Sequence, residues 1–99
     1  MKTKVSVGIA KKAFGMVYGE TGNYDRSMKS FEDSLKVWKD ANNMPQVEET
    51  YYEFAQMWKK KGDFDKARRC LEWSLNIVSE CGLEKKALRI KKELAELGN

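Results

Sequence analysis

The sequence contains no histidine, a single proline and only two cysteines. Histidine is the commonest general base and the commonest metal ligand, so its absence removes the usual starting point for catalysis or metal binding. No glycine-rich phosphate loop follows a strand-like segment either. Solvated helix surfaces and helix caps account for the carboxylate pairs Glu48/Glu49, Asp63/Asp65 and Glu93/Glu96. We therefore expect no enzyme and no bound metal or cofactor.

Long hydrophobic runs are also missing. No segment approaches the roughly 20 apolar residues that cross a bilayer. Lys11 and Lys12 interrupt the apolar residues near the start, and no signal-peptide cleavage pattern follows. The sequence predicts a cytoplasmic protein with no membrane contact.

The two cysteines, Cys70 and Cys81, lie on or near one predicted helix. Their separation corresponds to a helical rise of about 16 Å, which exceeds the reach of a disulfide. Two reduced thiols are the expected state in a reducing compartment. An intermolecular disulfide or a reactive thiol stays open as the alternative.

What remains is typical of one small folded domain, residues 1–99. Hydrophobic residues make up 41% of the chain and charged residues 34%, which is not the composition of a disordered tail. The net charge of +4 is mildly basic. That charge is compatible with acidic partners or nucleic acid but demands neither.

An internal repeat organises the chain. The segment Gly22-Asn23-Tyr24-Asp25-Arg26-Ser27 recurs 40 residues later as Gly62-Asp63-Phe64-Asp65-Lys66-Ala67. Apolar and aromatic residues before and after these segments match at the same offset, as Phe14 does with Phe54. The sequence predicts a first repeat at about 7–40, a second at about 45–81 and a closing helix at about 84–97.

Helical spacing of apolar residues predicts two helices in each repeat, and five helices in all with no strand. Glycines 22 and 62 stand where a helix should end, and Asn23 or Asp63 can cap the next helix. Pro45 is suited to a helix start. The expected helices cover residues 7–20, 24–40, 45–60, 64–81 and 84–97, and the stripe Ala10, Phe14, Val17 and Tyr18 is expected in the first.

The second helix of each repeat alternates small and large residues. Ser27 and Ser34 alternate with larger residues in the first repeat, as Ala67 and Ser74 do in the second. Small residues allow two helices to approach closely. Three tryptophans remain to be placed. Trp58 fits a core position, whereas Trp38 and Trp73 are either core residues or exposed interface anchors.

These residues resemble the tetratricopeptide repeat. The family unit has a small residue and an aromatic in its first helix, a Gly-Asp/Asn-Tyr/Phe turn, and a small–large–small pattern in its second. The first repeat supplies Gly15, Tyr18, Gly22-Asn23-Tyr24, Ser27, Phe31 and Ser34, and the second Ala55, Trp58, Gly62-Asp63-Phe64, Ala67, Leu71 and Ser74. The resemblance implies an all-α solenoid of a long-repeat kind, since the common unit has 34 residues and no proline closes the second helix here.

The resemblance also implies a function. Such stacks are protein-interaction scaffolds that hold a peptide or a partner helix on a concave face built from the first helix of each repeat. The fifth helix suits the role of a cap. On this chain the implied peptide-binding residues of the concave face are Lys12, Met16, Tyr52, Gln56, Lys59, Arg89 and Lys92.

One ligand code of the family does not fit. Lys12 and Arg89 match basic positions of the clamp that holds chaperone C-terminal tails. Met16 and Glu53 stand where that clamp has asparagine, and Glu93 replaces a basic residue. Glutamates would repel an acidic tail, so the resemblance argues against this partner.

A second hypothesis is binding to nucleic acid through the basic cluster of residues 59–69. Its members can neutralise phosphates. Acidic residues are interleaved with the cluster, however, and no array of aromatics for base stacking is evident. We therefore prefer a protein partner, and expect a monomer or a weak homodimer.

Overall fold

The computed structural model describes residues 2–98 and contains five α-helices and no strand in that range. The all-α fold expected from the repeat is therefore confirmed. The predicted domain also includes Met1 and Asn99, which lie outside the described residues. The helices are α1 (Lys2–Glu20), α2 (Tyr24–Asp40), α3 (Met44–Lys61), α4 (Phe64–Glu80) and α5 (Glu84–Glu96).

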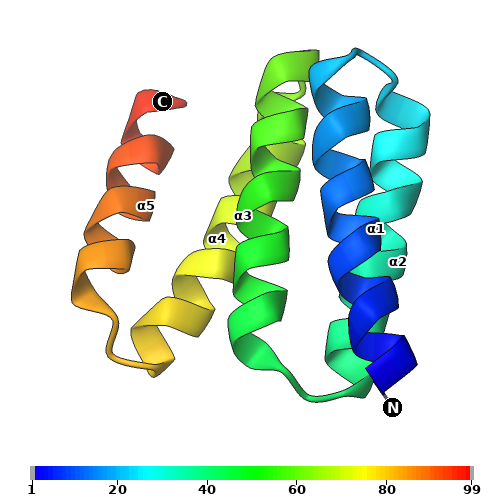
Figure 1. The fold of residues 1–99 in the computed structure, drawn as a ribbon. Coiled ribbons are helices and arrows are strands. Elements are labelled where there is room, and N and C mark those ends of the chain that lie inside the picture. Colours follow the sequence, from blue (N-terminus) through cyan, green and yellow to red (C-terminus); the bar gives the residue numbers. More distant parts are fainter. Residues whose placement is uncertain (1, 99) are drawn as a thin grey trace.

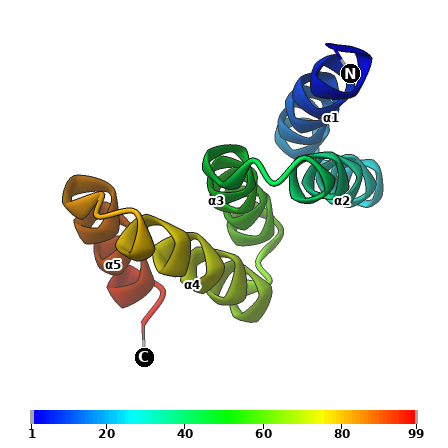
Figure 2. The same cartoon turned by 90° about the horizontal axis from the view of Figure 1, so that it is seen from below.

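Successive helices pack as antiparallel pairs in two layers. α1, α3 and α5 form one layer, and α2 and α4 form the other (Figures 1 and 2). α2 packs against both α1 and α3, and α4 packs against both α3 and α5. The result is a zigzag of helices when the molecule is seen from below (Figure 2). This is the arrangement of a helical-repeat solenoid, in which each unit covers its neighbour.

The four inter-helix turns repeat at intervals of 20 residues. Gly22, Asn42, Gly62 and Gly82 all have a positive φ, between 53° and 92°. Glycine takes this left-handed conformation without steric cost, and asparagine tolerates it better than most residues. The sequence indicated glycine-terminated helices at 22 and 62. The sequence did not indicate that Asn42 takes the same left-handed conformation in the turn between α2 and α3.

The helix starts follow the predicted capping only in part. The Asp63 carboxylate accepts a hydrogen bond from the backbone N–H of Lys66, and the Asn43 side chain accepts one from Gln46. Pro45 lies in the first turn of α3, as expected. The expectation that Asn23 caps α2 is wrong, because the side chain of Asn23 makes no capping hydrogen bond.

Helix α1 differs most from the sequence prediction. It begins at Lys2 rather than near residue 7, and its expected apolar stripe does not form the packed face. Gly8, Gly15 and Gly19 are buried instead, while Phe14 and Val17 are exposed. A Cβ on Gly8 or Gly15 would lie 2.7 Å from Trp38 or 2.9 Å from Phe31. The glycines therefore let the aromatic rings of α2 lie directly on the α1 backbone.

Serines of α2 complete this close contact. The Ser27 hydroxyl donates to the Gly15 carbonyl oxygen at 2.6 Å, and the Ser34 hydroxyl donates to that of Gly8 at 2.8 Å. Both serines are fully buried, so these bonds satisfy polar groups that would otherwise be costly to bury. The predicted role of small residues on α2 is confirmed.

Aromatic side chains dominate the core between the two helical pairs. Phe31 of α2 stacks on Phe54 of α3 with ring centroids 5.0 Å apart, and Phe54 stacks on Trp58 at 5.4 Å. Such pairs contribute about 0.5–1.5 kcal/mol each beyond their buried area. Trp38 is almost fully buried, so it belongs to the core.

Both cysteines are free thiols. Cys70 is buried, and burial raises the pKa of its thiol to about 12, which leaves little reactive thiolate. Cys81 is exposed at the end of α4. Within residues 2–98, none of the helices is long and apolar enough to cross a membrane.

Candidate functional site

Residues of α1, α3 and α5 line a groove. These three helices form one layer of the molecule (Figure 1). Its central pocket has a volume of about 330 Å³. Met16, Tyr52 and Ile90 contribute apolar surface, one from each helix. Charged groups of both signs surround these three, so that the full lining is Lys12, Met16, Glu48, Glu49, Tyr52, Glu53, Lys86, Arg89 and Ile90. We call this surface the α1–α3–α5 groove.

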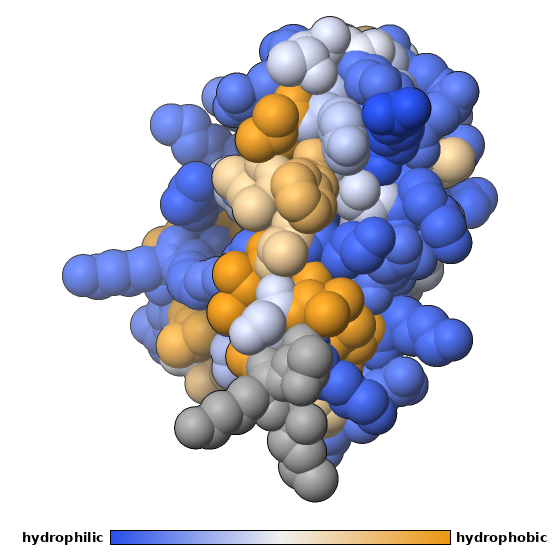
Figure 3. All heavy atoms as spheres, turned by 45° about the vertical axis from the view of Figure 1, so that its right-hand side comes forward, coloured by the Kyte–Doolittle hydropathy of each residue, from blue (hydrophilic) through white to orange (hydrophobic). Residues whose placement is uncertain are grey.

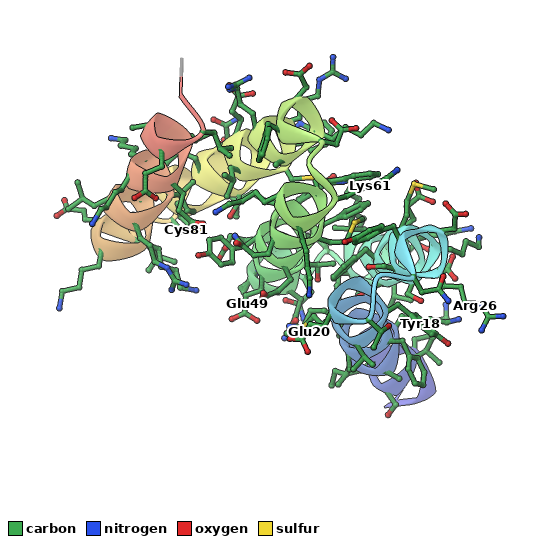
Figure 4. All side chains as sticks on the ribbon, turned by 90° about the horizontal axis from the view of Figure 1, so that it is seen from above. Tyr18, Glu20, Arg26, Glu49, Lys61 and Cys81 are labelled. Atoms are coloured by element: carbon green, nitrogen blue, oxygen red, sulfur yellow. The ribbon has the colours of Figure 1, made fainter. Side chains whose placement is uncertain are left out.

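Two lysines join the edge of α3 to α1. The Lys12 ammonium donates to Gln46 Oε1 at 3.3 Å and to Glu49 Oε2 at 3.2 Å. The Lys60 ammonium donates to the backbone carbonyl of Glu20 at 2.8 Å. In Figure 4, Glu20 and Glu49 lie on the side of the molecule where α1 and α3 border the groove. These contacts fix the width of the groove on that side.

On the other side, Glu93 of α5 joins three side chains of α3. The Tyr52 hydroxyl donates to Glu93 Oε2 at 2.5 Å. The Gln56 amide and the Lys59 ammonium donate to Glu93 Oε1 at 3.1 and 3.2 Å. Arg89, one turn earlier on α5, lies over the Tyr52 ring at 4.8 Å. This network orients α5 against α3 and presents the Arg89 guanidinium beside the pocket.

The environment of the groove shifts several pKa values. Burial raises the pKa of Tyr52 to about 12, and its hydrogen bond to Glu93 adds to the shift. Burial disfavours the ionised form of Glu93, but the three hydrogen bonds and the charge of Lys59 outweigh it and lower the pKa of Glu93. Burial raises the pKa of Glu53, although the charges of Lys12 and Arg89 act in the opposite direction. The groove thus holds two carboxylates with opposite pKa shifts.

The expectation that solvated helix surfaces explain the carboxylate pairs is wrong for Glu48. This residue is buried, and its carboxylate accepts hydrogen bonds from the Ser74 hydroxyl at 2.8 Å and from Lys86 at 3.2 Å. Sequence reasoning also missed Lys86 as a groove residue. Glu48 stands 40 residues after Gly8, and Ser74 stands 40 residues after Ser34, so this hydrogen bond repeats the contact between Ser34 and Gly8 in the first helical pair.

The seven residues expected on the concave face have different positions in the structure. Lys12, Met16, Tyr52 and Arg89 come together around the pocket. Gln56 lines an adjoining hollow between α1 and α3, together with Met16. Lys59 is engaged with Glu93 at the α3–α5 side. Lys92 is exposed on α5 and lines neither the pocket nor this hollow.

Trp73 lies outside the groove. Half of its surface is exposed, and its ring packs against Tyr51 of α3 at a centroid distance of 4.9 Å. It also lines a shallow hollow with Leu75 and Leu94. Trp73 is therefore neither a fully buried core residue nor a free surface anchor.

The basic cluster of residues 59–69 is largely engaged within the molecule. Lys59 and Lys60 make the groove contacts described above, and Lys66 lies over the Trp58 ring at 4.6 Å. Arg68 pairs with Asp65 at 3.4 Å and also donates to the Gly98 carbonyl. The positive groups of the cluster therefore contact several different residues of the protein and are not aligned along one surface.

The fold and the groove define a helical-repeat protein of the α-solenoid class. The family model described as tetratricopeptide repeat matches residues 13–37, which cover the second half of α1 and most of α2. This match supports assigning the chain to the tetratricopeptide repeat family, whose repeats generally mediate protein–protein interactions. No curated protein and no solved structure matched the chain.

Proposed function

We propose that the chain is a scaffold module whose α1–α3–α5 groove binds a peptide or a helix of a partner protein. The observation that carries this proposal is the pocket of about 330 Å³ to which all three helices of one layer contribute. Binding sites of this kind combine apolar surface with a few polar groups that orient the ligand. The proposed contact residues are Lys12, Met16, Tyr52 and Arg89 in the pocket, with Gln56 and Lys59 beside it and Lys92 exposed farther along α5.

The charges of the groove support a ligand of mixed character. Three basic and three acidic side chains surround the pocket. Lys12 and Lys86 already pair with Glu49 and Glu48, so a strongly acidic ligand would have to break these pairs. A segment with apolar side chains and both charge signs fits better than an acidic chaperone tail. The intramolecular contacts of the 59–69 cluster likewise favour a protein ligand over nucleic acid.

The whole module is proposed to be one domain of residues 1–99. Its first repeat would comprise α1 and α2, its second α3 and α4, with α5 as a closing helix. The Glu93 network and the Lys86–Glu48 ion pair at 3.2 Å support this role, because they tie α5 to α3. On this proposal α5 is needed for the groove as well as for the stack.

Peptides selected from a random library on the full chain provide the test. Met16→Asp and Arg89→Ala should each weaken their binding at least tenfold, because Met16 supplies apolar contact and Arg89 a cation beside the pocket. The matched controls are Lys36→Asp and Lys36→Ala on the exposed face of α2, which should bind as the wild type does. Equal affinities for groove and control variants would reject the groove as the binding site.

Salt titration of the same peptide complexes separates the two ligand classes. Binding of a peptide with apolar side chains and both charge signs should change only moderately with salt, whereas nucleic-acid binding falls steeply as counterions compete for phosphate contacts. A labelled single-stranded oligonucleotide that binds more tightly than every selected peptide, with a steep salt dependence, would favour the nucleic-acid hypothesis.

A further inference from the structure

Helix α1 carries an apolar surface that faces away from the rest of the molecule. We call Val7, Ala10, Phe14 and Val17 the outward face of α1. Phe14 is 52% exposed and Val17 is 57% exposed, although both are large apolar side chains. Figure 3 views the molecule from this side and shows apolar residues in orange and tan gathered around and above the grey residues. Contiguous apolar surface of this kind marks an interaction site more often than chance exposure.

The repeat offset gives this face a buried counterpart on α3. Residues 7, 10, 14 and 17 stand 40 positions before Val47, Thr50, Phe54 and Met57. All four of these α3 residues are buried, with Phe54 only 7% and Met57 only 4% exposed. The two helices are therefore built alike, but only α3 has a neighbour on this side.

The neighbour that covers α3 is α2. Phe31 of α2 stacks on Phe54 at 5.0 Å, and Lys39 donates to the Tyr51 hydroxyl at 2.6 Å. α2 itself is strongly amphipathic, with Ser27, Ser34 and large apolar residues on its buried side. A helix of this kind, placed on α1 as α2 is placed on α3, would bring an aromatic ring onto Phe14.

Charged residues border the outward face but do not interrupt it. Lys11 pairs with Asp33 of α2 at 3.6 Å, and Lys12 lies on the groove side of α1, where it pairs with Glu49. Arg26 lies over the Tyr18 ring at 5.9 Å, at the margin shown in Figure 4. Apolar residues outnumber charged residues in α1, and several of the large ones stay exposed.

We propose that the outward face of α1 docks an amphipathic helix of a partner protein, of the kind that α2 represents. The α2 and α4 helices of a second copy are each covered from two sides within their own molecule, so neither is free to take the place of this helix. The partner helix is expected to carry an aromatic or leucine residue flanked by small residues. This site is separate from the α1–α3–α5 groove and does not depend on it.

A helical peptide copied from α2 is the direct probe. Residues 23–41 are synthesised with a fluorescent label and a staple between positions 32 and 36, which are exposed in α2. Circular dichroism first establishes that the peptide is helical. Its fluorescence anisotropy with the full chain should show saturable binding, and Phe14→Asp should weaken that binding at least tenfold. A peptide carrying Phe31→Asp should bind similarly poorly.

Two control variants of the full chain sharpen this result. Leu88→Asp changes an exposed apolar residue of α5 in the same way and should leave peptide binding unchanged. Arg89→Ala alters the groove and should also leave it unchanged. Thermal unfolding of each variant shows whether it is folded, and Phe14→Asp should remain folded because its side chain is half exposed.

Four outcomes would overturn the proposal. The helical peptide could fail to bind the wild type, or it could bind wild type and Phe14→Asp equally. The third is seen by sedimentation: a wild-type dimer that Phe14→Asp converts to monomer would show that a second copy covers the face. If Arg89→Ala alone lost peptide binding, the peptide would be bound in the groove. That result would likewise overturn docking on α1.

Discussion

At the scale of single residues, glycines, which have no side chain, are as important for the packing of α1 as the large side chains that contact it. Gly8 and Gly15 bring the α1 backbone into contact with Trp38 and Phe31. A glycine within a helix costs roughly 1 kcal/mol relative to alanine. Burial of two large aromatic side chains of α2 against the helix offsets this cost.

Gly15→Ala is predicted to destabilise the protein by about 1–2 kcal/mol. The added Cβ would lie 2.9 Å from three carbons of the Phe31 ring, and such overpacking outweighs the gain in helix propensity. Chemical denaturation measures the effect. Gly19→Ala is the matched control and should destabilise the protein less, because its Cβ would lie 3.2 Å from Met57 Cγ and from Ser27 Oγ, farther than the 2.9 Å at Gly15. Equal stability of Gly15→Ala and the wild type would contradict the packing described for α1.

Glu93→Gln tests the electrostatics of the groove. The pKa of Glu93 is lowered in the folded state, so its charge contributes stability above the unfolded pKa of about 4.3. That contribution is lost as the pH falls through the lower folded pKa. The variant should therefore lose less stability than the wild type when the pH falls from about 5 to 3. Glu96→Gln, which changes an exposed carboxylate outside the network, is the control. A pH dependence of stability in Glu93→Gln equal to that of the wild type would refute the role of the network.

The hydrophobic pattern could not reveal which face of α1 is buried. Phe14 and Val17 stand at helical spacing and therefore predict a buried stripe. A glycine has no apolar side chain and so adds nothing to the hydrophobic pattern. The contact between Gly15 and Phe31 depends on how closely two distant segments approach. Burial of Glu48 was equally hidden, because its partners Ser74 and Lys86 come from α4 and α5.

At the scale of the elements, turns and helix ends were the most predictable features. Gly22, Gly62 and Pro45 signal their local conformation directly, because their backbone preferences do not depend on tertiary contacts. The ends of α2 to α5 accordingly fall within one residue of the positions expected from the sequence. The sequence did not predict the conformation of Asn42, because asparagine is also common in many other backbone conformations.

Exchanging the turn residues tests the regular spacing of the turns. Asn42→Gly should raise the free energy of unfolding by about 0.5 kcal/mol, because φ at this position is +53° and glycine adopts it without strain. Gly62→Asn, at φ +92°, should lower it by a similar or larger amount. Thermal denaturation of both variants measures the two shifts. Shifts of the same sign would contradict the shared conformation of these turns.

At the scale of the whole molecule, two surfaces of α1 have different proposed tasks. Met16 borders the groove shared with α3 and α5, whereas Phe14 lies on the outward face. A peptide ligand and a docked helix could therefore bind together. The repeat predicted from the sequence established which helices share a layer, and so which residues could meet in a groove. It could not place Lys59 in a network with Glu93, because that depends on the angle between α3 and α5.

Binding in the groove is the central claim, and amide chemical-shift mapping tests it most directly. The ¹⁵N-labelled full chain is titrated with a peptide selected on it. We expect the largest shift changes at Met16, Tyr52 and Arg89, with Lys36 on the exposed face of α2 unchanged. Changes centred on α2 or α4, with the amides of these three groove residues unmoved, would contradict the account.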